Sequence, residues 1–262
     1  MSESKNQLSL NTVHVGDCLE LMRHIPDRSV DMILCDLPYG TTSCKWDVII
    51  PFDELWEQYK RVVKDDGAIV LFGSEPFSSK LRVSNMNGFK YDWIWDKVSI
   101  SNPQLAKVQP LKNFEIISVF GKGKGRIRYY PQGLVKIENP KRRGSTVSDT
   151  ELLGHIKRRS DYVQTHTNYP KAMALRFPRP TKNVHPTQKP VELVEYLIKT
   201  YTNEGEVVLD NCLGSGTTAV AAINTGRNFI GIEKEAAYIE IAKQRVAAAY
   251  ETKTRRKTEE TQ

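Results

Sequence analysis

The sequence predicts an α/β fold, in which helices cover a doubly wound, mostly parallel sheet with an antiparallel edge. Short apolar runs rich in valine and isoleucine alternate with amphipathic segments, an order typical of βαβ units. The chain has 262 residues, 39% of them hydrophobic, which is enough to fill the core of one large domain. The alternation stops between residues 121 and 183 and then resumes, so we expect one α/β domain that carries an insertion.

The first 120 residues alternate apolar runs with helical patterns. We expect strands at residues 12–17, 30–36 and 68–73, and helices from Cys18, over 52–63 and near 76–86. Two further runs, FKYDWIWDK (89–97) and EIISVFGKG (115–123), also have strand character. They follow each other in the chain, so we expect them to pair antiparallel at one edge of the sheet.

The pattern returns after the insertion. Helices are expected at residues 191–202, 217–226 and 236–250, and strands at 206–211 and 228–233. The charged end ETKTRRKTEETQ is expected to be a flexible tail. The predicted organisation is therefore one half of the domain (1–120), the insertion (121–183), the other half (184–250) and the tail (251–262).

Positive charge is concentrated in the insertion. The whole chain carries a formal charge of +7, but residues 121–183 contain 15 basic and four acidic side chains, so the remainder is slightly acidic. This segregation favours a surface that binds a polyanion. The alternative is a solvated, loop-rich face with no partner.

Other features of the composition narrow the class of protein. The start, MSESKNQLSL, lacks a signal-peptide pattern, and no apolar run approaches the ~20 residues that span a bilayer. We therefore expect a cytoplasmic protein without membrane contact. Cys18, Cys35, Cys44 and Cys212 form no CxxC pair, so we expect reduced thiols and no metal site.

The stretch VVLDNCLGSGTTAVAA (207–222) reads as strand, acidic residue, glycine-rich turn and helix. Glycine lets backbone approach a ligand, and the helix that follows offers its free amides. The turn lacks the lysine of a P-loop, whereas Gly214-x-Gly216-x-x-Ala219 fits an NAD fingerprint. Asp210 would repel a pyrophosphate but would attract the amine of S-adenosylmethionine, and Glu233 can bind ribose in either case. A purely structural turn is the third alternative.

Topology places a second acidic residue beside this turn. In doubly wound sheets, ligands bind at the carboxyl ends of the strands, where the strand order reverses. If 207–210 is the first strand of the sheet and 30–35 the fourth, Asp210 and Asp36 face one crevice. The chain order then makes the fold circularly permuted, with both chain ends on the cofactor side.

Together and in this order, the motifs resemble those of DNA methyltransferases that modify exocyclic amines, in the permuted group called beta. Asp36-Leu37-Pro38-Tyr39 is similar to the family's Asp-Pro-Pro-Tyr, with leucine in place of the first proline. The turn at 210–218, the segment HPTQKP (185–190), GD (16–17) and GIE (231–233) resemble its cofactor-binding segments. The resemblance covers nearly the whole chain, except for about 125–180, which corresponds to a variable target-recognition region.

The resemblance implies roles for individual residues. The Asp36 carboxylate and the Pro38 carbonyl would bind the target amine, and Tyr39 would stack on the flipped-out base, with Phe114 as a second wall. The residues expected to bind S-adenosylmethionine are Asp17, Cys18, Thr187, Gln188, Lys189, Asp210, Leu213, Gly214, Ser215, Gly216, Thr217, Thr218 and Glu233. The basic residues expected to contact DNA phosphates are Lys141, Arg142, Arg143, Lys157, Arg158 and Arg159.

The implied function is methylation of adenine N6 in double-stranded DNA, because aspartate at the first position of the tetrapeptide is more typical of adenine than of cytosine enzymes. Cytosine N4 and RNA targets remain as close alternatives. An NAD-dependent oxidoreductase and a catalytically decayed nucleic-acid-binding protein, the latter suggested by Leu37, are alternatives from other classes. Many relatives are dimers, so a homodimer is also consistent with the sequence.

Overall fold

The computed structural model describes residues 7–44, 46–101, 103–140, 147–150, 154–157, 163–170, 173–180 and 188–260. The chain forms two compact units, one made of residues 1–130 and 173–262 and the other of residues 131–172. The larger unit contains the α/β domain and the smaller one is the central part of the predicted insertion. No helix in these described ranges is long and apolar enough to cross a membrane.

The larger unit is built on an eight-stranded sheet with the order β1-β12-β11-β2-β3-β5-β4-β10. Its strands are β1 (Thr12–Val15), β2 (Val30–Cys35), β3 (Val63–Gly73), β4 (Phe89–Ser101), β5 (Lys112–Phe120), β10 (Ala174–Arg176), β11 (Val207–Asp210) and β12 (Asn228–Glu233). Every neighbouring pair is parallel except β3 with β5 and β4 with β5. The predicted mostly parallel sheet with an antiparallel pair is therefore confirmed, although β10 adds one parallel strand outside that pair.

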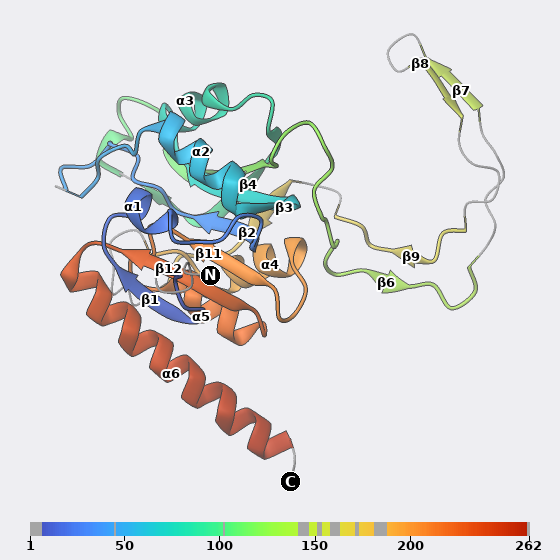
Figure 1. Ribbon diagram of the computed structural model, residues 1–262. Coiled ribbons are helices and arrows are strands. Elements are labelled where there is room, and N and C mark those ends of the chain that lie inside the picture. Colours follow the sequence, from blue (N-terminus) through green and yellow to red (C-terminus); the bar gives the residue numbers. More distant parts are fainter. Residues whose placement is uncertain are drawn as a thin grey trace. The chain divides into compact units, whose positions relative to one another are not determined.

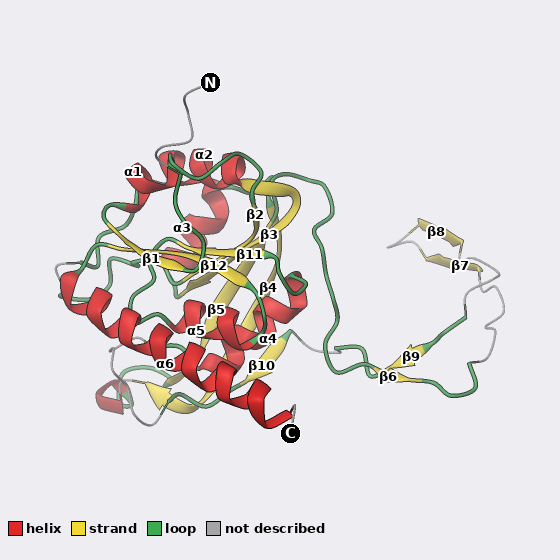
Figure 2. Ribbon diagram, turned by 60° about the horizontal axis from the view of Figure 1, so that its bottom comes forward, coloured by secondary structure: helices red, strands yellow, loops and turns green. Residues whose placement is uncertain are grey.

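Helices cover both faces of this sheet (Figures 1 and 2). One face carries α1 (Cys18–Met22), α2 (Phe52–Val62) and α3 (Phe77–Ser84), and the other carries α4 (Val191–Tyr201), α5 (Thr217–Asn224) and α6 (Ala236–Glu260). A short 3-10 helix, η1 (Pro103–Leu105), lies between β4 and β5. Along β2, Met32 and Leu34 pack in the core beneath α4 and α5, whereas Ile33 and Cys35 pack in the core beneath α2. Successive side chains of a strand point to opposite faces of the sheet, so the fully buried strand β2 contributes to both cores.

The strand order reverses between β11 and β2. These two strands are parallel neighbours, and Leu209 is in register with Ile33. The helix that follows β11 packs on one face and the helix that follows β2 packs on the other. The ends of β11 and β2 therefore border an open crevice, as doubly wound sheets require. The first strand, β1, pairs with the late strand β12, which confirms the permuted order.

The opposite end of β2 is held by a cluster of charged side chains. Arg128 donates to Asp31 at 2.9 Å, contacts Asp66 at 3.2 Å and also pairs with Glu206. Asp31 is 1% exposed and also accepts from Lys64 at 2.6 Å. The two basic groups hold the pKa of Asp31 below its usual value even though burial opposes this. The segment after β5 is thereby fixed to the sheet.

The smaller unit contains short antiparallel ribbons. β6 (Val135–Lys136) pairs with β9 (His166–Thr167), and β7 (Val147–Thr150) pairs with β8 (Gly154–Lys157). This compact unit is shorter than the predicted insertion of residues 121–183. Five of the predicted DNA-binding residues lie outside the described part of the chain, namely Lys141, Arg142, Arg143, Arg158 and Arg159. For the sixth, Lys157, the structure describes only its place at the end of β8.

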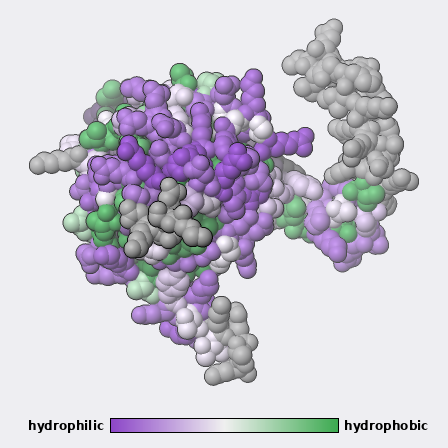
Figure 3. Space-filling model, viewed as in Figure 1, coloured by the Kyte–Doolittle hydropathy of each residue, from purple (hydrophilic) through white to green (hydrophobic). Residues whose placement is uncertain are grey.

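The end of the chain differs from its prediction. The sequence predicts a helix ending at Tyr250 and a flexible tail, but α6 continues to Glu260. The added turns contain no glycine or proline and are rich in lysine, arginine and glutamate, which favour helix. Lys253 also donates to the carbonyl of Ile223 at 2.8 Å, which ties this part of the helix to α5. Seen from the same side as in Figure 1, the described surface of the molecule carries mostly hydrophilic side chains (Figure 3).

Candidate active site

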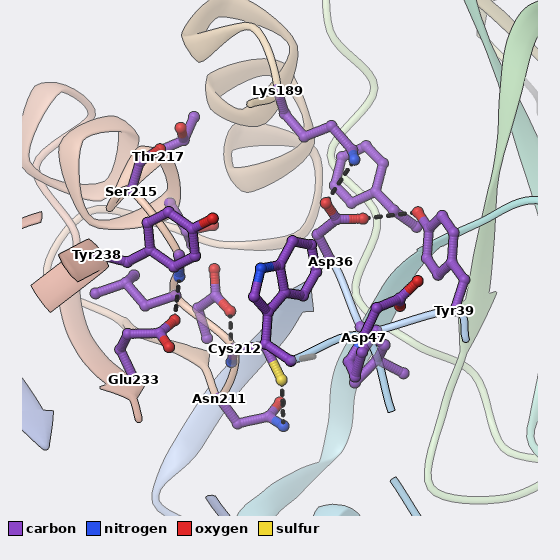
Figure 4. A pocket seen from close by; sticks show the side chains of 18 of the residues that line it. Asp36, Tyr39, Asp47, Lys189, Asn211, Cys212, Ser215, Thr217, Glu233 and Tyr238 are labelled. Atoms are coloured by element: carbon purple, nitrogen blue, oxygen red, sulfur yellow. Dashed lines mark hydrogen bonds and ion pairs between the residues drawn. The ribbon is translucent and has the colours of Figure 1, made fainter. Parts of the chain in front are cut away.

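A pocket of about 350 Å³ opens where the carboxyl ends of β11, β12, β2 and β1 meet (Figure 4). It is lined by 14 of the residues predicted from sequence: Asp17, Cys18, Asp36, Pro38, Tyr39, Gln188, Lys189, Asp210, Leu213, Gly214, Ser215, Thr217, Thr218 and Glu233. Of the remaining two predicted cofactor residues, Gly216 is buried at the start of α5 and Thr187 lies outside the described residues. The segments joined here are up to about 200 residues apart in the chain.

One half of the pocket is built around the glycine turn after β11. Glu233, at the end of β12, accepts a hydrogen bond from the Gly214 amide at 2.7 Å and two more from the amides of Lys234 and Glu235. Asp17, after β1, accepts from the Leu19 and Glu20 amides and thereby caps α1. The ends of β1, β11 and β12 thus bring the acidic side chains of Asp17, Asp210 and Glu233 to one cavity. This arrangement suits a ligand with hydroxyl and ammonium groups.

The turn itself is held rigidly. Gly216 has φ +84°, a conformation that favours glycine, and a Cβ there would meet the Cβ of Ala242 in α6 at 3.1 Å. From the same helix, Arg245 donates to the Ser215 carbonyl at 2.7 Å and to the Thr217 hydroxyl at 3.2 Å. Sequence reasoning did not identify Arg245, because its link to the turn depends on how α6 packs.

Asp210 is the buried carboxylate of this half. It is 5% exposed and accepts a hydrogen bond from the Cys212 amide at 3.1 Å. Burial raises the pKa of Asp210 to about 6, although hydrogen bonds from Thr218 and Cys212 oppose the shift. A cationic ligand group beside Asp210 would restore its charged form, which fits the prediction of an amine at this position.

Asp36 lies at the centre of the other half, directly after β2. Tyr39 donates from its hydroxyl to Asp36 Oδ1 at 2.6 Å, and Lys189 donates to Asp36 Oδ2 at 2.5 Å (Figure 4). The Tyr39 ring stacks on Phe77 with centroids 5.0 Å apart. Leu37 is 3% exposed and packs in the core beneath α2, so the leucine fills apolar space while Pro38 keeps its place at the pocket.

Asp36 belongs to a buried row of alternating charges. Lys189 Nζ also lies 3.4 Å from Glu115 Oε2, and Glu115 forms a second ion pair with Lys97. Burial raises the pKa of Asp36, which the Lys189 ammonium opposes and the Glu115 carboxylate reinforces. Burial also favours neutral Glu115, but Lys189 and Lys97 outweigh it and hold the pKa of Glu115 below its usual value.

Several pocket residues were not predicted as site residues. Phe72, Trp95, Lys97, Glu115 and Arg179 line the half around Asp36, and Trp46 and Tyr238 line the other half. Trp95 is 1% exposed and packs in the core, yet it also contributes to the pocket wall. Phe114, expected as a wall of a base pocket, is instead 38% exposed and contacts the Lys112 ammonium. Neighbouring residues of a strand point to opposite faces, so Glu115 enters the pocket and Phe114 does not.

Comparison with known proteins identifies the family to which the chain belongs. The profile of the DNA methylase family N6_N4_Mtase matches residues 30–244, which include both halves of the site. The chain is a member of this DNA methylase family. The family uses S-adenosylmethionine as its methyl donor. Membership removes the basis for the oxidoreductase alternative.

Individual relatives agree with this assignment. The type II methyltransferase M.HinfI of Haemophilus influenzae is 29% identical, over 94% of this chain and 70% of its own. M1.MboII of Moraxella bovis is 28% identical, over 88% and 95%. The solved complex of M1.HpyAVI with S-adenosylmethionine superposes with a TM-score of 0.59 at 25% identity, covering 90% of this chain and 98% of that one. The cytosine-N4-specific PvuII methyltransferase has the same fold, with a TM-score of 0.62 at 16% identity over 94% and 93%.

Proposed function

We propose that this DNA methylase transfers a methyl group from S-adenosylmethionine to N6 of adenine in double-stranded DNA. The observation that carries the proposal is the placement of Asp36 in the same pocket as Asp210, the glycine turn and Glu233. When bound, S-adenosylmethionine supplies the methyl group. Asp210 would hold its amine, Glu233 its ribose hydroxyls, and the turn amides would lie against the rest of the molecule.

The target amine needs help because its lone pair is delocalised into the base. The Asp36 carboxylate and the Pro38 carbonyl accept hydrogen bonds from its two N–H groups and favour a pyramidal nitrogen. Their effect is electrostatic and positional. The pocket is a concave cavity that a paired base cannot enter, so the base must leave the duplex first. We assign phosphate contacts to the basic clusters at 141–143 and 157–159.

Aspartate at the first position of the catalytic tetrapeptide supports adenine as the target. The fold does not decide between the bases, since a cytosine-N4-specific enzyme shares it. Both amines present the same pair of N–H donors to Asp36 and Pro38, so the choice between them depends on the remainder of the base pocket.

The test is incubation of the purified protein with unmethylated genomic DNA and methyl-labelled S-adenosylmethionine, followed by mass spectrometry of the nucleosides. Labelled N6-methyladenine is the expected product. Labelled N4-methylcytosine would retain the mechanism and refute the choice of base. No label in DNA, together with label in RNA, would refute DNA as the substrate. A thermal-shift series with S-adenosylmethionine and NAD checks the cofactor independently, because only the bound one stabilises the fold.

A further inference from the structure

The row Lys97, Glu115, Lys189 and Asp36 crosses the half of the pocket where the target base would bind. The four side chains come from β4, β5, the segment before α4 and the end of β2. Their side chains are only 9%, 15%, 8% and 25% exposed, respectively. Two lysines and two carboxylates make the row electrically neutral. Neutrality is what allows four such groups to be buried together.

This arrangement conflicts with the role of Asp36. Tyr39 and Lys189 already donate to its two oxygens. An incoming amine must donate to the same carboxylate, and the Lys189 ammonium occupies one of the approach directions. An ammonium that stays on Asp36 also neutralises the negative charge of the carboxylate that is needed to bind the target amine. The ammonium therefore needs a second acceptor within the pocket.

Glu115 offers that acceptor. Its Oε2 atom is buried and receives no hydrogen bond from any described residue. It lies 3.4 Å from Lys189 Nζ, so a small displacement of the ammonium shortens this contact to the ~2.8 Å of a charge-assisted hydrogen bond. The Phe72 ring, 5.1 Å from Nζ, supports a cation along this path.

We propose that Glu115 is a positioning residue that takes the Lys189 ammonium when the target amine binds Asp36. The inference rests on the proposed function, since it assumes an amine at Asp36. Lys97 completes the arrangement, because it neutralises Glu115 while Lys189 is still on Asp36. The row keeps its net charge in both states, and only one ammonium moves.

The first experiment measures methyl transfer by Glu115→Gln at saturating cofactor. We expect kcat to fall at least tenfold, while the KM for S-adenosylmethionine changes less than twofold. Since Lys97 loses its partner in this variant, Lys97→Met combined with Glu115→Gln provides a charge-balanced form that protects the fold. The matched control is Glu206→Gln, which removes a partly buried, ion-paired glutamate at the other end of the sheet and should leave kcat unchanged.

Two further readouts separate positioning from a structural role. Asp36 loses a neighbouring anion in Glu115→Gln, so the acid limb of the kcat profile should move to lower pH even as the rate falls. When Lys189→Met is present, adding Glu115→Gln should change kcat less than twofold, because no ammonium remains to be accommodated. Wild-type kcat in Glu115→Gln, or full additivity of the two changes, would refute the inference.

A crystal structure of Asp36→Asn tests the inference without any methylation assay. Removing the Asp36 charge should move Lys189 Nζ to within ~3.0 Å of Glu115. A lysine that stays on residue 36 or turns away from Glu115 would overturn the inference whether or not the enzyme methylates DNA. If wild type methylates no nucleic acid, the proposed function fails, and this structure still decides on Glu115.

Discussion

The pH dependence of cofactor binding tests the role of Asp210. The pKa of Asp210 is raised to about 6 by burial, so the carboxyl is about 90% ionised at pH 7 and about 10% at pH 5. If the ionised form binds the cofactor amine, the Kd for S-adenosylmethionine should rise about tenfold from pH 7 to pH 5. Over this range the α-amino group of S-adenosylmethionine stays protonated, so the change in Kd reports on the ionisation of the protein.

Isothermal titration calorimetry at half-unit pH steps measures this change, with Asp210→Asn as the control. The variant should bind S-adenosylmethionine weakly, and its Kd should change little with pH. A wild-type Kd that changes less than twofold between pH 5 and pH 7 would refute the role of Asp210.

The same shift predicts a stability effect of opposite sign. The folded protein holds the Asp210 proton more tightly than the unfolded chain does, so this stabilising contribution is present below the ordinary pKa of 3.8 and is lost as pH rises through about 6. Without cofactor, Asp210→Asn should therefore be more stable than wild type at pH 7, with a higher melting temperature and a free energy of unfolding that is larger by at most about 3 kcal/mol. A lower melting temperature would show that the hydrogen bonds of the ionised form outweigh its burial.

Other parts of the structure give further predictions. Arg128→Met should lower the free energy of unfolding by about 2–4 kcal/mol, measured by urea denaturation, because it leaves three carboxylates without their shared cation. Arg245→Met should loosen the turn after β11 and weaken S-adenosylmethionine binding about tenfold with little loss of fold; unchanged affinity would contradict its supporting role. Replacing the basic residues at 141–143 by glutamine should reduce the salt dependence of DNA binding, and an unchanged salt slope would place the DNA surface elsewhere.

Local periodicity was sufficient to predict most of the fold. Strands such as β2 and β12 are largely apolar runs, and an acidic residue marks the end of each: Asp36 directly after β2 and Glu233 as the last residue of β12. The rule that ligands bind where the strand order reverses then brought Asp36 and Asp210 together from sequence alone. The predicted end of the last helix, α6, was wrong because a run of charged residues is compatible with both a solvated tail and a solvated helix. Packing of Lys253 against α5 was not visible in the sequence.

The half of the site around Asp36 was harder to predict because it depends on register between antiparallel strands. Trp95 lies opposite Glu115 in the pairing of β4 with β5, so both side chains reach the same face. Nothing in the sequence fixes that register, and shifting it by one residue would bring Phe114 to the pocket instead. Lys189 was predicted as a cofactor residue from resemblance; its contact with Asp36 could be seen only once β2 and the segment before α4 were placed together.

A single-turnover assay of Asp36→Ala with labelled S-adenosylmethionine and unmethylated DNA, beside the wild-type protein, tests the role of Asp36. We claim that Asp36 acts on the target amine and not on the cofactor or the fold. The predicted result is a loss of at least a hundredfold in the methyl-transfer rate, with cofactor and DNA affinities within threefold of wild type. Methylation near the wild-type rate would contradict the claim.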